Sequence, residues 1–281
     1  MKTNHLNTSL PCFKFSNVQR AFFWQCHSFL LLLGVVLSLT WLPGVQAATD
    51  CAAVTEIPSV ECEALVALYN STDGPNWYDS SGSNWNVTDT PCSWAGVTCV
   101  DGHVTEIHRY ENNLVGTIPS ELGNLNQLTD LNLSGDWQAA NQLSGSIPSE
   151  LGNLSQLISL SLNYNQLTGT IPDLSALTNL ELLRLFNNQL TGTIPDLSAL
   201  TNLVWFDLGS NQLTGTIPDL SALTNLQYLY LFNNQLTGTI PDLSALTNLQ
   251  SLDLFNNQLT GTIPDLSALT NLELLRLSII S

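Results

Sequence analysis

Aromatic and charged side chains recur at fixed spacing in the second half of this chain of 281 residues. They fall inside a seven-residue window that returns every 23 residues, at 181–187, 204–210, 227–233 and 250–256. The side chains that could contact a ligand are Phe186, Trp205, Tyr228, Tyr230, Phe232 and Phe255, with Arg184, Asp207 and Asp253 among them. This is the composition of a recognition surface, because large rigid rings supply contact area and a few charges set orientation.

Catalysis finds little support in the same sequence. After residue 47 the chain has two histidines, His103 and His108, and no lysine. It contains no Ser-His-Asp arrangement, no H-E-x-x-H motif and no phosphate-loop pattern. We therefore expect a protein that is not an enzyme and that has neither a metal site nor a cofactor.

The elements that position these side chains follow from the repeats. The four units of residues 171–262 are identical outside the variable window, and a fixed period of this size is typical of a solenoid whose units bury their apolar faces by stacking. Aligned on L-x-x-L-x-L-x-x-N-x-L, the repeats start at Val104, Leu128, Leu157, Leu180, Leu203, Leu226, Leu249 and Leu272, and the last is incomplete. The alternating x-L-x-L-x core predicts a short strand in each of these eight repeats, with its leucines pointing inward, and hence one parallel sheet.

The third, fifth and seventh positions of each repeat should point outward on the inner curve of the solenoid, because side chains alternate across a strand. All nine residues named above occupy these positions. Drift after duplication could also explain why they vary. However, Asp196, Ser198 and Thr201 should be at least partly exposed too, yet they do not vary among the four units. The outward strand positions are therefore predicted to bind a ligand or, alternatively, to form a patch through which the protein self-associates.

The invariant positions have structural interpretations. An asparagine at the end of each strand should turn inward and bond to backbone groups of adjacent coils. These asparagines are Asn165, Asn188, Asn211, Asn234 and Asn257. An aspartate also recurs once per unit, as Asp173, Asp196, Asp219, Asp242 and Asp265. Calcium would need about six to eight converging oxygens, which one carboxylate per coil does not supply, so we expect each aspartate to cap a short helical turn.

The first part of the chain is typical of an export signal. Lys2, Lys14 and Arg20 precede an apolar run over 29–42 and a small-residue site at 45–48. A membrane-spanning helix needs roughly 20 residues, so this shorter run predicts a secretory signal peptide over 1–47, with a retained signal anchor as the alternative. We expect the protein to be secreted or held at the cell surface, or to lie in a periplasm.

Residues 48–103 should form a cap in front of the repeats at 104–281. The cap contains the cysteines Cys51, Cys62, Cys92 and Cys99, which allow three pairings. We expect the local one, Cys51 with Cys62 and Cys92 with Cys99, in an oxidising compartment. A zinc site is the competing interpretation, but the cysteine spacings and the exported context argue against it.

The cap should also contain one helix and an aromatic core. Ser59–Asn70 is predicted to be helical and capped by Ser59, with Val60, Ala64, Leu65 and Leu68 as its apolar stripe. Three tryptophans, Trp77, Trp85 and Trp94, should fill the core of the cap. In the first repeat an inward leucine site holds Arg109, which we expect to snorkel beneath the cap.

Charge restricts the partners. All 23 acidic residues follow residue 49, and after residue 47 only Arg109, Arg184 and Arg276 remain as bases, so the formal charge of this part is 3 minus 23, or −20. Such a surface repels phosphate backbones and anionic headgroups. We therefore expect no nucleic acid and no anionic membrane as a partner; cationic partners, neutral glycans or a saline exterior fit better.

The repeats resemble plant-type leucine-rich repeats, whose pattern L-x-x-L-x-L-x-x-N-x-L-x-G-x-I-P is matched from Leu157 to Pro172 and again through Pro264. The cap resembles that family as well, since PCSWAGVTC at 91–99 matches its P-C-x-W-x-G-V-x-C segment. The segment ALVALYNSTDGPNW at 64–77 is similar to the cap of exported bacterial and microbial members. This chain departs from the family pattern in its 23-residue units and in D-L-S where the helix start x-x-L-G is usual.

The resemblance implies an α/β repeat solenoid, a leucine-rich-repeat right-handed superhelix. Its parallel β-sheet would line the concave face, with short 3-10 or extended segments on the convex face. It also implies that an extracellular protein, peptide or glycan binds on the concave face, as in receptor-kinase ectodomains and polygalacturonase-inhibiting proteins.

The last repeat copies the first of the four units through 273–277 and then has Ser-Ile-Ile-Ser where Phe-Asn-Asn-Gln is expected. Loss of one nucleotide from codons for Phe-Asn-Asn-Gln-Leu gives Ser-Ile-Ile-Ser and a stop codon. We therefore expect a frameshift within a longer array, which resequencing would test. An open leucine end would favour self-association.

Overall fold

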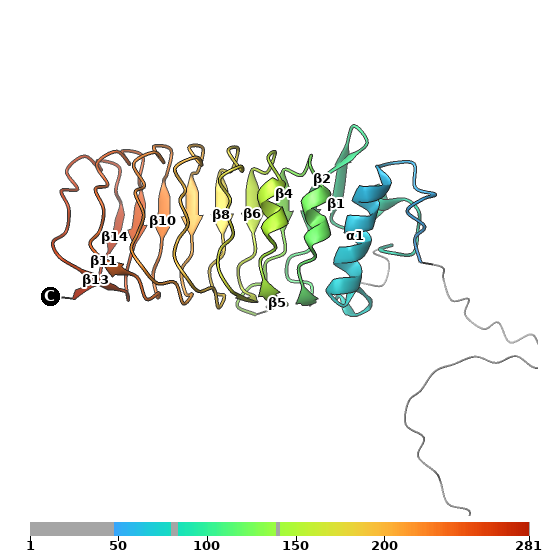
Figure 1. The fold of residues 1–281 in the computed structure, drawn as a ribbon, viewed down its shortest axis with the longest axis horizontal. Coiled ribbons are helices and arrows are strands. Elements are labelled where there is room, and N and C mark those ends of the chain that lie inside the picture. The colour runs from blue at the N-terminus through green and yellow to red at the C-terminus, as the bar shows by residue number, and fades with distance from the viewer. Residues whose placement is uncertain (1–47, 80–83, 139–140, 281) are drawn as a thin grey trace, which may run out of the picture. The chain divides into compact units, whose positions relative to one another are not determined.

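The computed structural model describes residues 48–79, 84–138 and 141–280. The predicted signal peptide, residues 1–47, lies outside the described residues. Within the described ranges, no helix combines the length and the apolar character needed to cross a membrane. Figure 1 shows coils stacked in chain order from helix α1 (Ser59–Ser71), at the right, to the C-terminus at the left.

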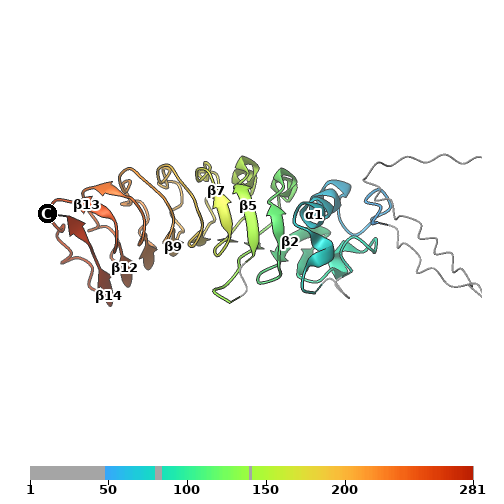
Figure 2. The ribbon, with the colours of Figure 1, turned by 90° about the horizontal axis from the view of Figure 1, so that it is seen from below.

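One strand from each repeat lies in a nine-stranded sheet. Its parallel strands are β2 (His103–His108), β4 (Asp130–Asn132), β6 (Ser159–Ser161), β8 (Leu182–Arg184), β9 (Trp205–Asp207), β10 (Tyr228–Tyr230), β12 (Ser251–Asp253) and β14 (Leu274–Arg276). The ninth, β1 (Val97–Val100), comes from the cap and pairs antiparallel with β2. The predicted leucine-rich-repeat solenoid is confirmed, and its parallel sheet lies on the concave face (Figure 2).

The core is built from the inward positions of every strand. In the repeat of β8, Leu180, Leu183 and Leu185 are at most 1% exposed, and burying a leucine stabilises the fold by about 1.5–3 kcal/mol. The predicted asparagine ladder is present. Asn188 donates from Nδ2 to the carbonyls of Leu162 and Leu185, each at 3.0 Å, and its Oδ1 accepts the N–H of Leu167 at 3.0 Å.

Two smaller parallel sheets, which the sequence did not predict, lie beside the main one. They contain β3 (Val115–Thr117), β5 (Gln142–Ser146) and β7 (Gln166–Thr168), and β11 (Thr237–Gly238), β13 (Gln258–Thr260) and β15 (Ile279–Ile280). Three of these strands, β7, β11 and β13, come from the Gln-Leu-Thr-Gly segments that follow the ladder asparagines, and β5 comes from the similar Gln-Leu-Ser-Gly segment. They satisfy backbone groups that the packed coils would otherwise bury without partners.

The far side of the coils is partly helical. The first repeats form two 3-10 helices, η3 (Ser120–Asn124) and η4 (Ser149–Asn153). In the later repeats the expected helical turn is instead a plain turn, closed by the Leu200 N–H on the Leu197 carbonyl at 2.8 Å. The capping bond itself is present, since Oδ1 of Asp196 accepts the N–H of Ser198 at 2.9 Å.

Helix α1 departs from prediction at its start. Pro58, not Ser59, occupies the N-cap position, without a side-chain cap. Val60 is 42% exposed, whereas Glu61 is 2% exposed. The helix turns Glu61 inward because its carboxylate accepts the Val104 N–H at 2.8 Å and lies 2.6 Å from Nδ1 of His103, tying the helix to β2.

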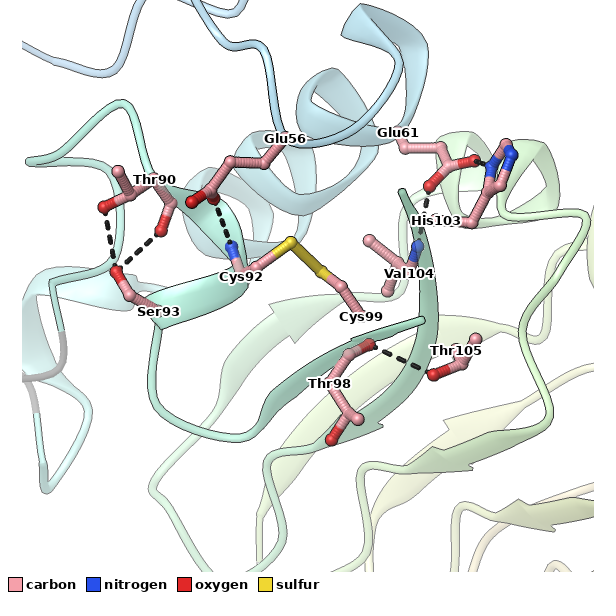
Figure 3. The surroundings of a disulfide bond; sticks show 10 residues. All are labelled: Glu56, Glu61, Thr90, Cys92, Ser93, Thr98, Cys99, His103, Val104 and Thr105. Carbon is pink, nitrogen blue, oxygen red and sulfur yellow. Dashed lines mark hydrogen bonds and ion pairs between the residues drawn. A yellow bond between two sulfur atoms is a disulfide. The ribbon is translucent and has the colours of Figure 1, made fainter. Parts of the chain in front are cut away.

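Both predicted disulfides, Cys51–Cys62 and Cys92–Cys99, are present. The second joins Cys92, in the short helix η2 (Pro91–Ser93), to Cys99 in β1, beside the Glu61–His103 contact (Figure 3). Glu56 also holds this corner, accepting the Cys92 N–H at 3.1 Å. The second disulfide thus fastens the first strand of the sheet to the rest of the cap, and the first ties Cys51 to α1.

The tryptophans fill the cap core as predicted. Trp77, which follows helix η1 (Gly74–Asn76), is 2% exposed, and Trp85 and Trp94 are each 1% exposed. Arg109 does not snorkel outward but stays buried, with its guanidinium 4.4 Å from the Trp77 ring centroid. It stays there because it donates to the carboxylate of Asp79 at 2.9 Å and to the carbonyl of Ala95 at 2.9 Å.

Candidate functional site

The concave sheet brings the predicted site residues into rows. Leu182, Trp205 and Tyr228 are register partners on successive strands, and so are Arg184, Asp207 and Tyr230. The second row continues through Asp253 to Arg276. Neighbouring strands lie about 4.8 Å apart, so side chains in a row are within contact distance of one another.

The rows build a stack in the middle of the sheet. The guanidinium of Arg184 lies 4.5 Å from the ring centroid of Trp205. The Trp205 ring in turn lies 4.3 Å from that of Tyr228 and 5.6 Å from that of Tyr230. Tyr228 is held in place because its hydroxyl donates to Oε1 of Gln250 at 2.9 Å. These contacts fix the rings before any ligand arrives, which lowers the entropic cost of binding.

The other predicted rings flank this stack. Phe232 lies over Gly209, where a Cβ would collide with its ring. Phe255 is 45% exposed and has Arg276 above its ring at 5.2 Å. Phe186 contacts the ring of Tyr164 at 5.1 Å. The aromatic residues therefore form one central group with a separate ring contact on either side.

The two predicted aspartates are not exposed. Asp207 is 6% exposed and Asp253 is 5% exposed. Their strand positions do point outward, but Asp207 lies among Trp205, Tyr230 and the Phe232-covered Gly209. Large neighbouring rings thus cover short carboxylates, so these side chains form the floor of the surface and not its rim.

The two carboxylates differ in their partners. Oδ1 of Asp207 accepts the N–H of Gly209 at 3.0 Å, and Oδ1 of Asp253 accepts the N–H of Phe255 at 3.0 Å. Arg276 additionally donates to Oδ2 of Asp253 at 2.9 Å. Burial raises the pKa of Asp207 to about 7, against the opposing effects of the Gly209 N–H and of Arg184.

Sequence reasoning missed three contributors. Tyr164 extends the aromatic surface, and its signal was an aromatic residue where the later repeats have Asn187, Ser210, Asn233 and Asn256. Gly209 makes room for Phe232, and its signal was a glycine in a column of phenylalanines. Ser251, which is 6% exposed on the outward side of β12, gave no signal in the sequence.

Two polar atoms of this surface are unsatisfied. Within the described part of the chain, Nε1 of Trp205 and Oγ of Ser251 are buried and have no hydrogen-bond partner. Buried polar groups are normally paired, so these two could gain a partner when a ligand binds.

A groove of about 1130 Å³ lies elsewhere, between α1 and the turns of the first repeats. Ser71, Pro119, Glu121 and Glu150 are among its lining residues, and no aromatic side chain lines it. It is wide open and lacks the rigid anchors that concentrate binding energy. The concave aromatic surface is therefore the stronger candidate site.

Family models match most of the described chain. The Leucine rich repeat N-terminal domain matches residues 58–100. Leucine Rich Repeat matches 156–176, 179–199 and 248–268, and Leucine Rich repeats (2 copies) matches 201–245.

Curated relatives come from Arabidopsis thaliana. The leucine-rich repeat receptor protein kinase EMS1 is 36% identical over 86 residues, which are 30% of this chain and 7% of that protein. The inactive leucine-rich repeat receptor-like serine/threonine-protein kinase At1g60630 is 34% identical over 129 residues, or 46% of this chain and 15% of that protein. The chain thus spans only a small part of these relatives' length. They are plant proteins and give no support to the bacterial or microbial resemblance of the cap.

Solved structures of leucine-rich repeat receptors are also similar to this chain. The PEPR1-AtPEP1 structure has a TM-score of 0.69 at 34% identity, covering 78% of this chain and 31% of that one. The plant peptide hormone receptor RGFR1 in complex with RGF2 has a TM-score of 0.58 at 40% identity, covering 62% and 28%. The ectodomain of the receptor kinase SOBIR1 from Arabidopsis thaliana has a TM-score of 0.56 at 29% identity, covering 66% and 98%. The parallel solenoid, its disulfide-bonded cap and the family matches together show that the chain is a leucine-rich repeat protein with an N-terminal domain of that family.

Proposed function

We propose that this protein is an exported, non-enzymatic recognition protein that binds a peptide or protein segment on the concave face of its repeats. The observation that carries the proposal is the stack of Arg184, Trp205 and Tyr228, with ring contacts of 4.5 and 4.3 Å. Large aromatic side chains that are already held in place are the typical anchors of binding surfaces. A purely structural solenoid would not need such a group on its outward strand positions.

The similar structures support the same choice of ligand class. RGFR1 was solved in complex with RGF2 and is described as a peptide hormone receptor. The receptor-like relatives also support an extracellular location, which fits the disulfide-bonded cap.

The test is selection from a displayed random nonapeptide library with the full chain expressed for export. Peptides that are enriched should bind the Trp205→Ala/Tyr228→Ala variant at least about tenfold more weakly, because aromatic hot spots contribute about 2 kcal/mol or more. Trp137→Ala is the matched control, since Trp137 is 77% exposed outside the strand surface. Its affinity should equal that of the wild type, and all three proteins should give the same circular dichroism spectrum.

Two results would contradict the proposal: no enriched peptide, or enriched peptides that bind the double variant like the wild type. Sedimentation velocity of the same proteins examines the alternative, self-association. If the wild type forms oligomers that the double variant loses, and no peptide is enriched, the aromatic surface serves self-association instead.

A further inference from the structure

Asp207 and Asp253 are equivalent residues in two repeats, yet only one has an ionic partner. Oδ2 of Asp253 accepts from Arg276 at 2.9 Å. Asp207 also has an arginine as its register neighbour, Arg184, but that guanidinium lies over the Trp205 ring instead. Within the described residues Asp207 therefore makes no ion pair.

One oxygen of Asp207 remains open. Oδ1 accepts the Gly209 N–H, whereas no hydrogen bond reaches Oδ2 from the described residues. Oδ2 is nevertheless absent from the fully buried polar atoms that lack a partner. The 6% exposure of Asp207 must therefore include Oδ2.

The surroundings of this oxygen favour a cation. Trp205 lies two residues away on the same strand face, and Tyr230 is the register partner of Asp207 on the next strand. Their rings meet edge to face at 70°. Arg184 and Tyr228 already lie against the Trp205 ring from the two neighbouring strands, so the attraction must come from the carboxylate. A buried carboxylate gains much more from a charged donor than an exposed one does.

The geometry also distinguishes among cations. A guanidinium binds a carboxylate best through two parallel hydrogen bonds that use both oxygens. At Asp207 one oxygen is already occupied by the Gly209 N–H, so a guanidinium could make only the single bond that Arg276 makes to Asp253 and would lose its two-bond advantage. A compact ammonium group, with its charge at one point on a slender stem, fits a single, mostly buried acceptor better.

We propose that Asp207, with the rings of Trp205 and Tyr230, forms a subsite for a primary ammonium group of the ligand, namely a lysine side chain or the amino terminus of a peptide. The subsite rests on the proposed function, because it names the chemistry of a ligand for the same surface. Net charge supports the subsite, since the chain has 23 acidic residues and only 6 basic ones. An attractive field of this kind speeds the approach of a basic ligand.

The experiment uses the nonapeptides enriched in the library selection. Each is resynthesised with every lysine in turn acetylated, with the amino terminus acetylated, or with lysine replaced by arginine. Affinities are measured by fluorescence anisotropy at pH 8 for the wild type, Asp207→Asn and Asp196→Asn. Asp196 is a matched control because it lies in the same 23-residue unit (194–216), carries the same charge and accepts the N–H two residues on, but on an exposed turn.

We expect acetylation of one amine to weaken binding to the wild type by about tenfold or more, because hydrogen bonds to charged groups are the stronger ones. The same acetylation should have little effect on peptide binding to Asp207→Asn, whereas it should weaken binding to Asp196→Asn as much as to the wild type. Replacement of that lysine by arginine should weaken binding to the wild type.

The ammonium subsite is wrong if the enriched peptides tolerate acetylation of every amine, or if acetylation weakens Asp207→Asn as much as the wild type. In either case, continued sensitivity to Trp205→Ala/Tyr228→Ala would leave the proposed function standing. Equal losses in Asp207→Asn and Asp196→Asn would indicate general charge attraction and would also overturn the subsite. If no peptide is enriched, both proposals fail.

Discussion

At the scale of single residues, the concave aromatic surface contains a carboxylate whose burial lowers the stability of the folded protein. An exposed aspartate is charged at neutral pH, but burial raises the pKa of Asp207 to about 7. Such an arrangement costs the folded protein free energy and is typical of residues retained for function.

The first prediction concerns this cost. Because the pKa of Asp207 is raised from 3.8 to about 7 in the folded state, its contribution to stability is fully present below pH 3.8 and is lost as pH rises through 7. Asp207→Asn should therefore be more stable than the wild type at pH 8, by up to about 4 kcal/mol, and similar to it near pH 3.5. Urea unfolding at both pH values measures the difference. Equal midpoints at pH 8 would contradict it.

Asp196→Asn is again the matched control. Bonds from the backbone and side chain of Ser198 lower the pKa of Asp196, so this pKa shift is opposite in sign to that of Asp207. Its replacement should bring no gain in stability at pH 8. A gain as large as that of Asp207→Asn would mean that relief of general charge repulsion explains both results.

The second prediction concerns Asp79, which pairs with the buried Arg109. Partial burial opposes the charge of Asp79, but the hydrogen bond and charge of Arg109 outweigh it and lower its pKa. Asp79→Ala would leave the buried guanidinium of Arg109 without its carboxylate partner. The free energy of unfolding should fall by about 2 kcal/mol, a figure reduced for the partial exposure of Asp79. Chemical denaturation monitored by tryptophan fluorescence measures the loss.

Glu63→Ala is the control for the Asp79 variant, because Glu63 is an exposed acid on the cap helix. It should change stability by less than about 0.5 kcal/mol. The stability contributed by Asp79 should also disappear as pH falls below 3.8, in keeping with its lowered pKa. A wild-type midpoint that is the same at pH 2.5 and pH 6 would argue against this role.

At the scale of elements, the asparagine ladder joins successive coils. Asn188 bonds four backbone groups, on Leu162, Leu167, Leu185 and Phe186. Its Nδ2 and Oδ1 therefore do what no apolar residue could do at this buried position, which is 8% exposed.

The third prediction follows from the ladder. Asn188→Ala leaves the buried N–H of Leu167 without a partner. It also removes a bond from the carbonyls of Leu162 and Leu185, which keep their bonds from Asn165 and Asn211. The loss should be about 2 kcal/mol or more in total. Asn179→Ala in the same repeat removes one exposed bond, to the Ser155 carbonyl, and should cost less than about 1 kcal/mol. Thermal unfolding of both variants measures the contrast. Equal losses would show that burial does not set the value of these bonds.

At the scale of the whole molecule, acidic charge accumulates along the coils. The aspartates of the D-L-S turns come close enough that Asp173 and Asp219 both raise the pKa of Asp196, although bonds from Ser198 outweigh them. With 23 acidic and three basic residues after residue 47, repulsion extends along the stack.

The fourth prediction is that salt stabilises the protein. Raising NaCl shortens the Debye length from about 30 Å at 0.01 M to about 8 Å at 0.15 M, which screens this repulsion. The unfolding midpoint should therefore rise with NaCl. In the triple variant Asp196→Asn/Asp219→Asn/Asp242→Asn the rise should be smaller. A midpoint that falls with salt would mean that attractive ion pairs outweigh repulsion.

Much of the fold could be predicted because the repeat is highly regular. Alternating leucines predicted the strand of each repeat, and the inward asparagines were assigned correctly because a buried amide in a stacked coil has few other uses. The small sheets were not predicted, because Gln-Leu-Thr segments pair only once the coils are stacked. Ser59 was misassigned as the cap because the contact of Glu61 with β2, which sets how α1 lies, is not visible in the local sequence.

The sequence by itself determined which residues lie on the concave surface, since strand alternation assigns every third, fifth and seventh position to one face. Only the tertiary structure decided which of these are anchors and which form the floor. Arg184 could have paired with Asp207 as Arg276 pairs with Asp253, and the sequence does not distinguish the two. The Trp205 ring holds Arg184 away and leaves Oδ2 of Asp207 open, because contacts among side chains of different coils depend on their packing and not on the period of the repeat.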